Sequence, residues 1–317
     1  MKDHRPFFVH LKGIIPIYEG GRRVTIAFEP ITLERRDDYL HLYNLTPQKA
    51  SDYSFINLWA WHNDRKYEWA FEADLCWLRT TSSESIQWAP VGSWHSIDWR
   101  NVLSKLFPNG VVFDRVPENL ANILQQSLGD DIQLEEEREE WEYIYRVSDL
   151  IELSGNRFHK KKNLLQQFIR SYDYSYSPIT LANIGHIIEL QKEWCEWRNC
   201  DDSPGLKAES CAIRRVLEHW GEMPSISGGV LSVKDQMVAY TVAESIDNET
   251  IVIHFEKGMT DYKGVYQAIN QIFLDHSAHS FEWVNREQDM GSEGIRKAKM
   301  SYNPATFLKK YRVTWGA

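Results

Sequence analysis

The stretch HFEKGMTDYKGVYQAINQIFLDH, residues 254–276, decides the fold of the second half of this chain. It begins as the end of a buried strand and becomes an amphipathic helix with Val265, Ala268 and Ile269 on one face. Gly264 lies near the junction. The first turn of a helix offers unpaired N–H groups and a partial positive charge, which attract a phosphate or carboxylate. We therefore expect the turn at 261–266 to hold an anion or a polar donor group.

Asp261 and Tyr266 limit how tightly such a group binds at this turn. Asp261 places a carboxylate beside the free N–H groups, where it can act as the helix cap and compete with an anionic ligand. The Tyr266 side chain crowds the approach to these groups. We therefore expect the turn to hold its ligand weakly, with the group anchored partly by Lys263, Arg296 and Lys299.

The segments on either side of this stretch predict an ordered series of helices and strands. Two helices and three strands joined by short turns come before it, and a strand, a short helix, a helix that starts with proline and a last strand come after it. The ranges are 181–199 and 209–220 for the helices, 228–235, 236–247 and 250–258 for the strands, and 279–287, 291–302, 304–311 and 311–315 for the later elements.

The first half alternates helices with short strands in a similar way. Its helices are predicted at 35–45, 98–107 and 118–129, and its strands at 66–81, 85–92 and 111–117. The acidic run 130–147 predicts a solvated loop that leads into a strand, with cation binding as the alternative. A turn and a basic helix, residues 157–170, follow. We predict an α/β (α+β) protein with domains at 1–150 and 151–317.

Composition agrees with two folded domains. The chain has 317 residues, 43% of them apolar, and its 13 tryptophans can fill a core or line a groove. The net charge of −9 argues against nonspecific binding to nucleic acid, and no DNA partner is expected. Cys76, Cys195, Cys200 and Cys211 show no CxxC spacing, which predicts reduced thiols and no metal site.

The N-terminus does not have the pattern of a secretion signal. Asp3, Arg5 and Lys12 interrupt the region where a signal peptide needs an unbroken apolar segment. No run of 18 apolar residues occurs elsewhere in the sequence. The sequence therefore predicts a cytoplasmic protein without a transmembrane segment.

The order of elements from residue 180 onward is similar to the GNAT (acyl-CoA N-acyltransferase-like) fold. In that fold the fourth strand separates from the fifth, and the helix after the fourth strand binds the pyrophosphate of coenzyme A. Residues 250–258 match that strand and 261–273 that helix. GNAT enzymes commonly show [QR]xxGx[GA] at this turn. This chain keeps Gly264 but has Tyr266 in place of the second small residue, where a glycine would leave the approach open. We therefore expect weak or absent coenzyme A binding.

Four segments together resemble the DUF2156 family, which is related to the C-terminal domain of phosphatidylglycerol lysyltransferases and to Fem peptidyltransferases. They are SDYSFINLWAW (51–61), SGNRFHKKKNLLQQF (154–168), HFEKGMTDYKGVYQAIN (254–270) and NREQDMGSEGIRKAKMSYNP (285–304). The resemblance covers nearly the whole chain. It implies two tandem GNAT-like domains, each a mixed, mainly antiparallel sheet flanked by helices.

The resemblance also implies a function. Relatives of the family move an aminoacyl group from aminoacyl-tRNA to an amine or hydroxyl, so we expect an acyl- or aminoacyl-transferase that works by direct attack. The donor is expected to be an acyl-CoA or an aminoacyl-tRNA, with no cofactor certain, and the acceptor a small molecule, a lipid headgroup or a peptide. The alternative is a noncatalytic module that binds an anionic small molecule or peptide between the domains.

Three residues are candidates for the catalytic base. Glu256 and His254 face the same way on a strand, and a carboxylate there could accept a proton from an attacking amine. Glu256 is the first choice and Asp289 the second. The alternative is that Glu256 only pairs with Lys297 or Lys299 to secure the sheet.

The candidates for substrate binding cluster after predicted strand ends and on two basic helices. They are Lys160, Lys161, Lys263, Gly264, Tyr266, Asn285, Arg286, Gln288, Arg296, Lys299 and Tyr302. For the lysines the alternative is a solvated helix face, and for the tyrosines it is packing. We expect His254, Glu256, Asn285, Arg286 and Arg296 to line one polar pocket, with Lys160 or Lys161 at its rim.

Overall fold

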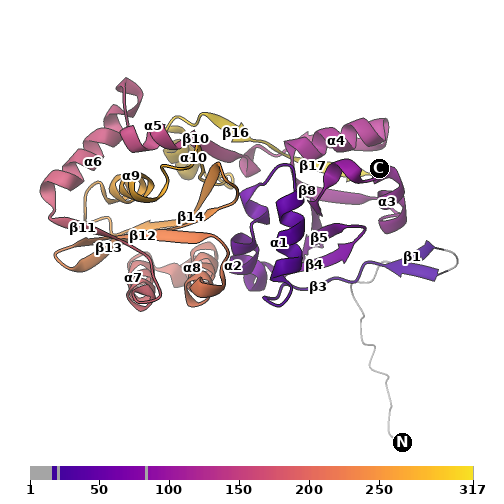
Figure 1. Ribbon diagram of the computed structural model, residues 1–317, viewed down its shortest axis with the longest axis horizontal. Helices are drawn as coiled ribbons and strands as arrows, with labels where there is room; N and C mark the ends of the chain where they lie inside the picture. The colour runs from indigo at the N-terminus through magenta and orange to yellow at the C-terminus, as the bar shows by residue number, and fades with distance from the viewer. Residues whose placement is uncertain (1–15, 20–21, 83–84, 317) are drawn as a thin grey trace, which may run out of the picture.

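The computed structural model describes residues 16–19, 22–82 and 85–316 (Figure 1). It contains two mixed β-sheets, each flanked by helices, which form two lobes side by side. The predicted α/β class and the tandem arrangement are thereby confirmed. Most of the N-terminal stretch that bears on a secretion signal lies outside the described residues.

The first lobe contains one large sheet with strand order β3-β4-β5-β6-β8-β17-β9, and β7 pairs with β5. Its strands are β3 (Glu29–Pro30), β4 (Tyr67–Glu72), β5 (Leu75–Thr80), β6 (Ile86–Trp88), β7 (Val91–Gly92), β8 (Val111–Pro117), β9 (Ile132–Glu136) and β17 (Lys310–Trp315). Its helices are α1 (Arg36–Leu45), α2 (Phe55–Arg65), α3 (Trp99–Leu106) and α4 (Glu118–Leu128). A separate hairpin joins β1 (Pro16–Glu19) to β2 (Arg22–Thr25).

The second lobe is built on a sheet with strand order β11-β12-β13-β14-β15-β10-β16. Its strands are β10 (Glu142–Arg146), β11 (Tyr174–Pro178), β12 (Ile226–Val233), β13 (Gln236–Ser245), β14 (Thr250–Gly258), β15 (Trp283–Asn285) and β16 (Thr306–Leu308). Its helices are α5 (Val147–Glu152), α6 (His159–Ser171), α7 (Ile184–Trp197), α8 (Pro204–Glu218), α9 (Val265–Ser277) and α10 (Glu293–Met300).

Local sequence explains several of these boundaries. Ser54 accepts a hydrogen bond from the Asn57 N–H and so caps α2, and Ser292 caps α10 in the same way. Lys234 and Asp235 both have positive φ, which is the geometry of a tight turn between the antiparallel strands β12 and β13.

Strands β14 and β15 have the separation that is typical of a GNAT fold. They run parallel and pair only between Thr250–Val252 and Trp283–Asn285, so the second half of β14 lies apart from β15. Helix α9 connects the two strands. The first lobe contains the same arrangement of two parallel strands connected through a helix, because β6 and β8 are parallel and α3 lies between them in the chain.

The two sheets exchange one strand each. β10 lies before residue 150 in the chain but pairs with β15 and β16 of the second sheet. β17, at the end of the chain, pairs with β8 and β9 of the first sheet. The sheets therefore do not follow the predicted division into 1–150 and 151–317, and both crossings tie the lobes together.

The structure corrects three sequence expectations. The helix predicted at 304–311 is wrong, because the Ala305 N–H binds the Ile144 carbonyl and the segment adds strand β16 to the edge of β10. The acidic run contains a strand, β9, before its loop. Cys195 and Cys200 form a disulfide, since the chain turns at Asn199 and brings their Cα atoms to 5.1 Å.

Tryptophans mainly fill the core. Trp69, Trp77, Trp94 and Trp99 are almost fully buried in the core of the first lobe. Trp88 is also buried from solvent, yet its side chain reaches the wall of the cavity that is described next.

Candidate functional site

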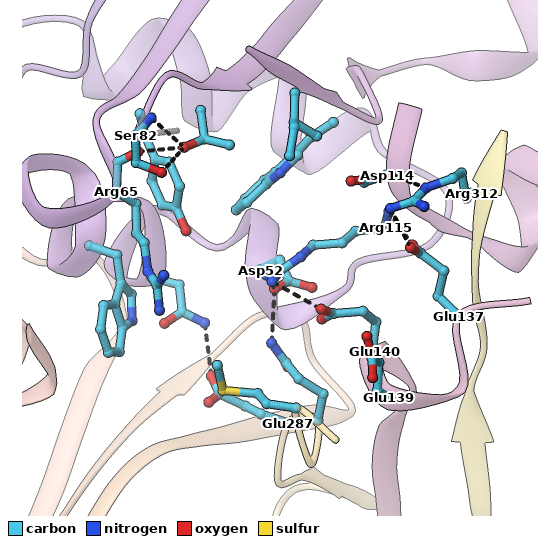
Figure 2. A pocket seen from close by; sticks show the side chains of 18 residues that line it. Asp52, Arg65, Ser82, Asp114, Arg115, Glu137, Glu139, Glu140, Glu287 and Arg312 are labelled. Atoms are coloured by element: carbon cyan, nitrogen blue, oxygen red, sulfur yellow. Dashed lines mark hydrogen bonds and ion pairs between the residues drawn. The ribbon is translucent and has the colours of Figure 1, made fainter. Parts of the chain in front are cut away.

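A cavity of about 370 Å³ lies between the two lobes (Figure 2). The first lobe contributes side chains from α2, β4, β5, β6 and β8, and the second contributes the loop that follows β15. The charged residues in its wall are Asp52, Asp114, Glu137, Glu139, Glu140, Glu287, Arg65, Arg115 and Arg312. Carboxylates therefore outnumber guanidinium groups, and the cavity favours a cationic group over an anionic one.

Buried ion pairs form one side of the cavity. Arg115 donates to Asp52 at 2.6 Å and to Glu140 at 3.1 Å. Lys310, which is fully buried, contacts Asp52 and lies 2.6 Å from Glu142. Burial alone would raise the pKa of Asp52, but the charges of Lys310 and Arg115 outweigh it and hold the pKa below its usual value. Asp52 is therefore an anion that orients its neighbours.

Glu287 connects the cavity to a buried histidine. His254 Nδ1–H donates to Glu287 Oε1 at 2.9 Å, and His254 Nε2–H donates to Glu244 Oε2 at 2.9 Å. Burial lowers the pKa of His254, but hydrogen bonds to the two glutamates raise it to about 9. His254 is therefore protonated at neutral pH, and Glu244, Glu287 and His254 form a carboxylate–imidazolium–carboxylate chain.

The Glu287 side chain accepts the hydrogen bonds of both its partners, His254 and Asn57, through the same oxygen, Oε1. Asn57 Nδ2 also donates to Glu287 Oε1, at 2.8 Å. Among the described residues, no hydrogen bond reaches Glu287 Oε2. The carboxylate is thus fixed in orientation while its second oxygen remains available to a substrate.

The loop that presents Glu287 is held in an unusual conformation. Glu287 and Met290 have φ values of 57° and 52°, in the left-handed region that residues other than glycine rarely adopt. Lys299 Nζ donates to the carbonyl oxygens of Arg286, Glu287 and Gln288, at 2.6, 3.2 and 2.6 Å. Burial lowers the pKa of Lys299 to about 8. This one side chain therefore fixes three consecutive carbonyl groups.

Asp289 secures the other end of the loop. It accepts from Arg296 Nε and Nη2 at 2.9 Å each and from the Tyr143 hydroxyl at 2.6 Å. Burial would raise the pKa of Asp289, but the hydrogen bonds from Arg296 and Tyr143 lower it to about 2. Asp289 does not line the cavity.

Two buried acceptor oxygens in the cavity wall have no partner. Within the part of the chain that the structure describes, neither Glu140 Oε2 nor Gln288 Oε1 accepts a hydrogen bond. Each residue binds one member of the Arg115–Asp52 ion pair through its other polar atom: Glu140 Oε1 accepts from Arg115, and Gln288 Nε2 donates to Asp52. Buried acceptors are normally satisfied, so these two oxygens indicate where a ligand donates.

The predicted pocket is not the observed one. Of the predicted site residues, only Gln288 lines this cavity. Asn285 donates to the buried carboxylate of Glu142, and Arg296 borders a shallower neighbouring pocket. His254 reaches the cavity only through Glu287. The expectation that these residues line one pocket with Glu256 and Arg286 is therefore wrong.

A second group of predicted residues surrounds Arg286. Arg286 donates to Glu256 at 3.1 Å and lies over the ring of Tyr302, and Lys161 lies over the same ring. Glu256 therefore pairs with Arg286 and not with Lys297 or Lys299. Lys160 is exposed to solvent on α6. The catalytic roles predicted for Glu256, His254 and Asp289 stay predictions.

The turn at the start of α9 is closed by the protein itself. Gly264 has φ 85°, and a Cβ atom there would collide with the Leu164 carbonyl oxygen of α6. Gly264 occupies the cap position without a side-chain cap bond, so Asp261 does not cap the helix. Lys263 is exposed, and Tyr266 is half-buried against the second core. The glycine therefore allows α6 to pack closely against α9, and two N–H groups of the turn already bind the protein, that of Lys263 to the Tyr172 hydroxyl and that of Val265 to the Tyr262 carbonyl.

Sequence reasoning missed Asp52, Arg115, Glu140, Glu287 and Lys310 as site residues. A signal for part of this set was present, because the segments 51–61 and 285–304 that carry the family resemblance meet at the cavity through Asn57 and Glu287. Arg115 and Lys310 lie in short strands with no such signal.

A comparison with protein families identifies the same family as the four segments quoted from the sequence. The family described as phosphatidylglycerol lysyltransferase, C-terminal, matches residues 43–314. The chain belongs to this family. The matched region includes every residue named above in the cavity wall and its supporting network.

Solved structures of family members and relatives share the fold. A conserved protein of unknown function from Bacteroides thetaiotaomicron is 32% identical with a TM-score of 0.83, covering 92% of this chain and 99% of that one. The C-terminal domain (DUF2156) of a putative lysylphosphatidylglycerol synthetase from Agrobacterium fabrum is 12% identical with a TM-score of 0.61, covering 89% and 91%. FemX is 7% identical with a TM-score of 0.58, covering 92% and 98%.

One curated relative aligns over part of its length. An uncharacterised protein of Mycoplasmoides gallisepticum is 27% identical over 175 residues, which are 54% of this chain and 55% of that protein. The alignment thus spans about half of the relative. Among the described residues of this family member, no helix is long and apolar enough to cross a membrane.

Proposed function

We propose that this protein transfers an aminoacyl group from an aminoacyl-tRNA to the amine or hydroxyl of an acceptor, by direct attack within the cavity between the lobes. Membership of the lysyltransferase family supports this class of reaction. The observation that carries the proposal is the Glu287–His254–Glu244 chain, which ends in an available carboxylate oxygen at the cavity.

In the proposed reaction Glu287 is the general base. The acceptor nitrogen or oxygen attacks the ester carbonyl of the aminoacyl-tRNA, and Glu287 Oε2 takes the proton that the acceptor loses. As the ester bond breaks, Glu287 returns the proton to the departing ribose oxygen. His254 and Asn57 hold Glu287 Oε1 throughout and act as positioning residues.

The acidic wall of the cavity favours an aminoacyl donor over an acyl-CoA. An aminoacyl group carries an ammonium with three N–H donors, and Glu140 Oε2 and Gln288 Oε1 are two buried acceptors that have no partner among the described residues. An acyl-CoA lacks that ammonium and brings several negative charges to a wall where acids outnumber arginines. The same imbalance argues against a noncatalytic site for an anionic small molecule in this cavity.

The acceptor class follows from relatives only. The name of the family points to a lipid headgroup, and FemX-like peptidyltransferases point to a peptide. We propose a phospholipid headgroup as the first acceptor to test, with a peptide amine as the second.

The experiment is a transfer assay with defined donors. Purified protein is incubated with a radiolabelled aminoacyl-tRNA pool or with acetyl-CoA, and with phospholipid vesicles or amine-bearing peptides. We expect label to pass to an acceptor from aminoacyl-tRNA only. Glu287→Gln should abolish transfer, whereas Glu135→Gln, on the exposed part of β9, should not. Transfer from acetyl-CoA, or equal transfer by Glu287→Gln, would contradict the proposal.

A further inference from the structure

Helix α10 is held to its lobe by two cations and not by apolar packing. None of its residues is buried, and only Arg296 and Lys299 are half-buried, while the other residues of the helix are exposed. These two residues are three apart and share one face of the helix. A helix of a folded domain normally turns an apolar face inward, so the charged inward face of α10 has another use.

Both cations bind the loop that follows β15. Arg296 donates to the Asp289 carboxylate, and Lys299 Nζ donates to the carbonyl oxygens of residues 286–288. The Tyr145 hydroxyl donates to the Lys299 carbonyl at 2.9 Å and so ties the end of α10 to β10. Helix α10 therefore acts as a clamp on this loop.

The charge of Lys299 is used on the backbone alone. Among the ion pairs formed by the described residues, none includes Lys299. An ammonium group that is withdrawn from water is costly unless a carboxylate compensates its charge. An apolar side chain at this position would avoid that cost, so the stability of the fold does not account for the lysine.

The three bonds from Lys299 favour the conformation that brings Glu287 to the cavity. Three consecutive carbonyl groups can face one atom only where the chain leaves the extended conformation, and Glu287 does so with φ 57°. This conformation is unfavourable for residues other than glycine and persists only where its surroundings hold it. In this conformation the Glu287 side chain lines the cavity and accepts from His254 and Asn57.

We propose that Lys299 is a positioning residue, which keeps the Glu287 carboxylate in the cavity by binding the backbone of its loop. Without the ammonium, three carbonyl groups lose their donor, and the strained residue relaxes and turns its carboxylate away from His254. The Arg115–Asp52 pair stays in place, because both of its residues belong to the first lobe. The role of Glu287 as general base rests on the proposed function, but the role of Lys299 in placing Glu287 does not.

The test observes His254 by NMR and needs neither donor nor acceptor. The two imidazole N–H groups donate to different carboxylates, Nδ1–H to Glu287 and Nε2–H to Glu244, so each should give a protected signal in protein with isotope-labelled histidine. His254→Gln identifies these signals among the 11 histidines of the chain. In Lys299→Met the Nδ1–H signal should shift or disappear, while the Nε2–H signal stays.

The matched control is Lys297→Met. Lys297 lies in the same last turn of α10 and is exposed. Each substitution removes one cation from that turn, so the loss of a favourable interaction with the helix dipole is common to both variants. Only Lys299→Met should change the His254 signal, and circular dichroism melting shows whether both variants are folded. Lys299→Gln, whose amide has two N–H donors for three carbonyl groups, replaces Lys299→Met if that variant does not fold, and should weaken the same signal.

The transfer assay adds a second readout. Lys299→Met should lower kcat by about 10²-fold, the effect of displacing a catalytic group by a small distance. KM for the donor should stay within about three-fold, because the Arg115–Asp52 pair still holds the donor subsite. An unchanged Nδ1–H signal in Lys299→Met, or the same change in Lys297→Met, would overturn the inference. A changed signal in a protein whose wild type transfers nothing would contradict the proposed function alone.

Discussion

Two segments leave neighbouring strands of the second sheet, and they differ in what occupies the space in front of them. The turn after β14 contains a glycine and begins a helix, yet the backbone of α6 packs against it. The loop after β15 has no glycine before Gly291, yet Glu287 and Gln288 from this loop line the cavity. At Gly264 the missing side chain makes room for the backbone of helix α6 and not for a ligand.

The two segments are also held by different forces. The turn depends on close packing, and the loop depends on buried charges such as Lys299 and Asp289. Substitutions in the turn should therefore destabilise the protein through steric clashes, and substitutions around the loop should destabilise it by leaving buried charges unpaired.

Lys310→Ala should give the largest change in stability. It leaves the buried carboxylates of Asp52 and Glu142 without their shared cation, which costs about 3–5 kcal/mol. Urea unfolding measures the loss. The neighbouring Lys309 is partly exposed and lies 3.9 Å from Glu136, so Lys309→Ala should stay within about 0.5 kcal/mol. A small effect of Lys310→Ala would show that the charges are not needed to hold the cavity wall.

Gly264→Ala should come next, at about 3 kcal/mol. The added Cβ meets the Leu164 carbonyl, and φ 85° is strained for alanine. Gly294 in α10 has nothing within 4 Å of a built Cβ, so Gly294→Ala should be neutral or slightly stabilising in the same unfolding experiment. If Gly264→Ala were tolerated, α6 would not close this turn.

His254 should make stability depend on pH. Its folded pKa of about 9 lies above the ordinary value of 6.5, so its contribution is complete below pH 6.5 and is lost as pH rises toward 9. Between pH 6.5 and 8 the free energy of unfolding should fall by up to about 2 kcal/mol. Above pH 8 the lowered pKa of Lys299 acts with the opposite sign.

The control for this pH dependence is His254→Gln, which keeps one donor but cannot titrate. Its free energy of unfolding should change less across the same pH range. An unchanged slope would place the titrating group elsewhere.

Asp261→Asn should give the smallest effect, below about 0.5 kcal/mol, because Asp261 is exposed and does not cap α9. A loss of about 1 kcal/mol in thermal unfolding, typical of a removed cap, would show that the carboxylate does stabilise the helix start.

Much of the fold could be predicted from hydrophobic periodicity. Strands β12, β13 and β14, the turn at Lys234 and Asp235, and helix α9 all carry local signals. The helix predicted at 304–311 failed because its proline and apolar residues suit a strand edge as well, and pairing with β10 decided between them. The crossing of β17 into the first sheet depends on contacts that are distant in sequence.

The site was harder to predict, because its residues also come together through contacts that are distant in sequence. The segment 285–304 could be recognised as polar residues after a strand, and it does reach the cavity through Gln288. In a strand, successive side chains point to opposite faces. Glu287 has a left-handed backbone conformation, so this alternation does not predict which residues of the loop face the cavity. Lys310 reaches Asp52 and Arg115 only because β17, from the end of the chain, joins the first sheet beside β8.

The most direct test compares Glu287→Gln with Glu256→Gln in the transfer assay, with circular dichroism to show that both are folded. If the cavity is the site, Glu287→Gln should lower kcat/KM by about 10²- to 10⁴-fold, the usual contribution of a general base. Glu256→Gln, which keeps the shape of a side chain paired with Arg286, should change kcat/KM far less. A large loss with Glu256→Gln and a small one with Glu287→Gln would place the chemistry at the strand separation and contradict this account.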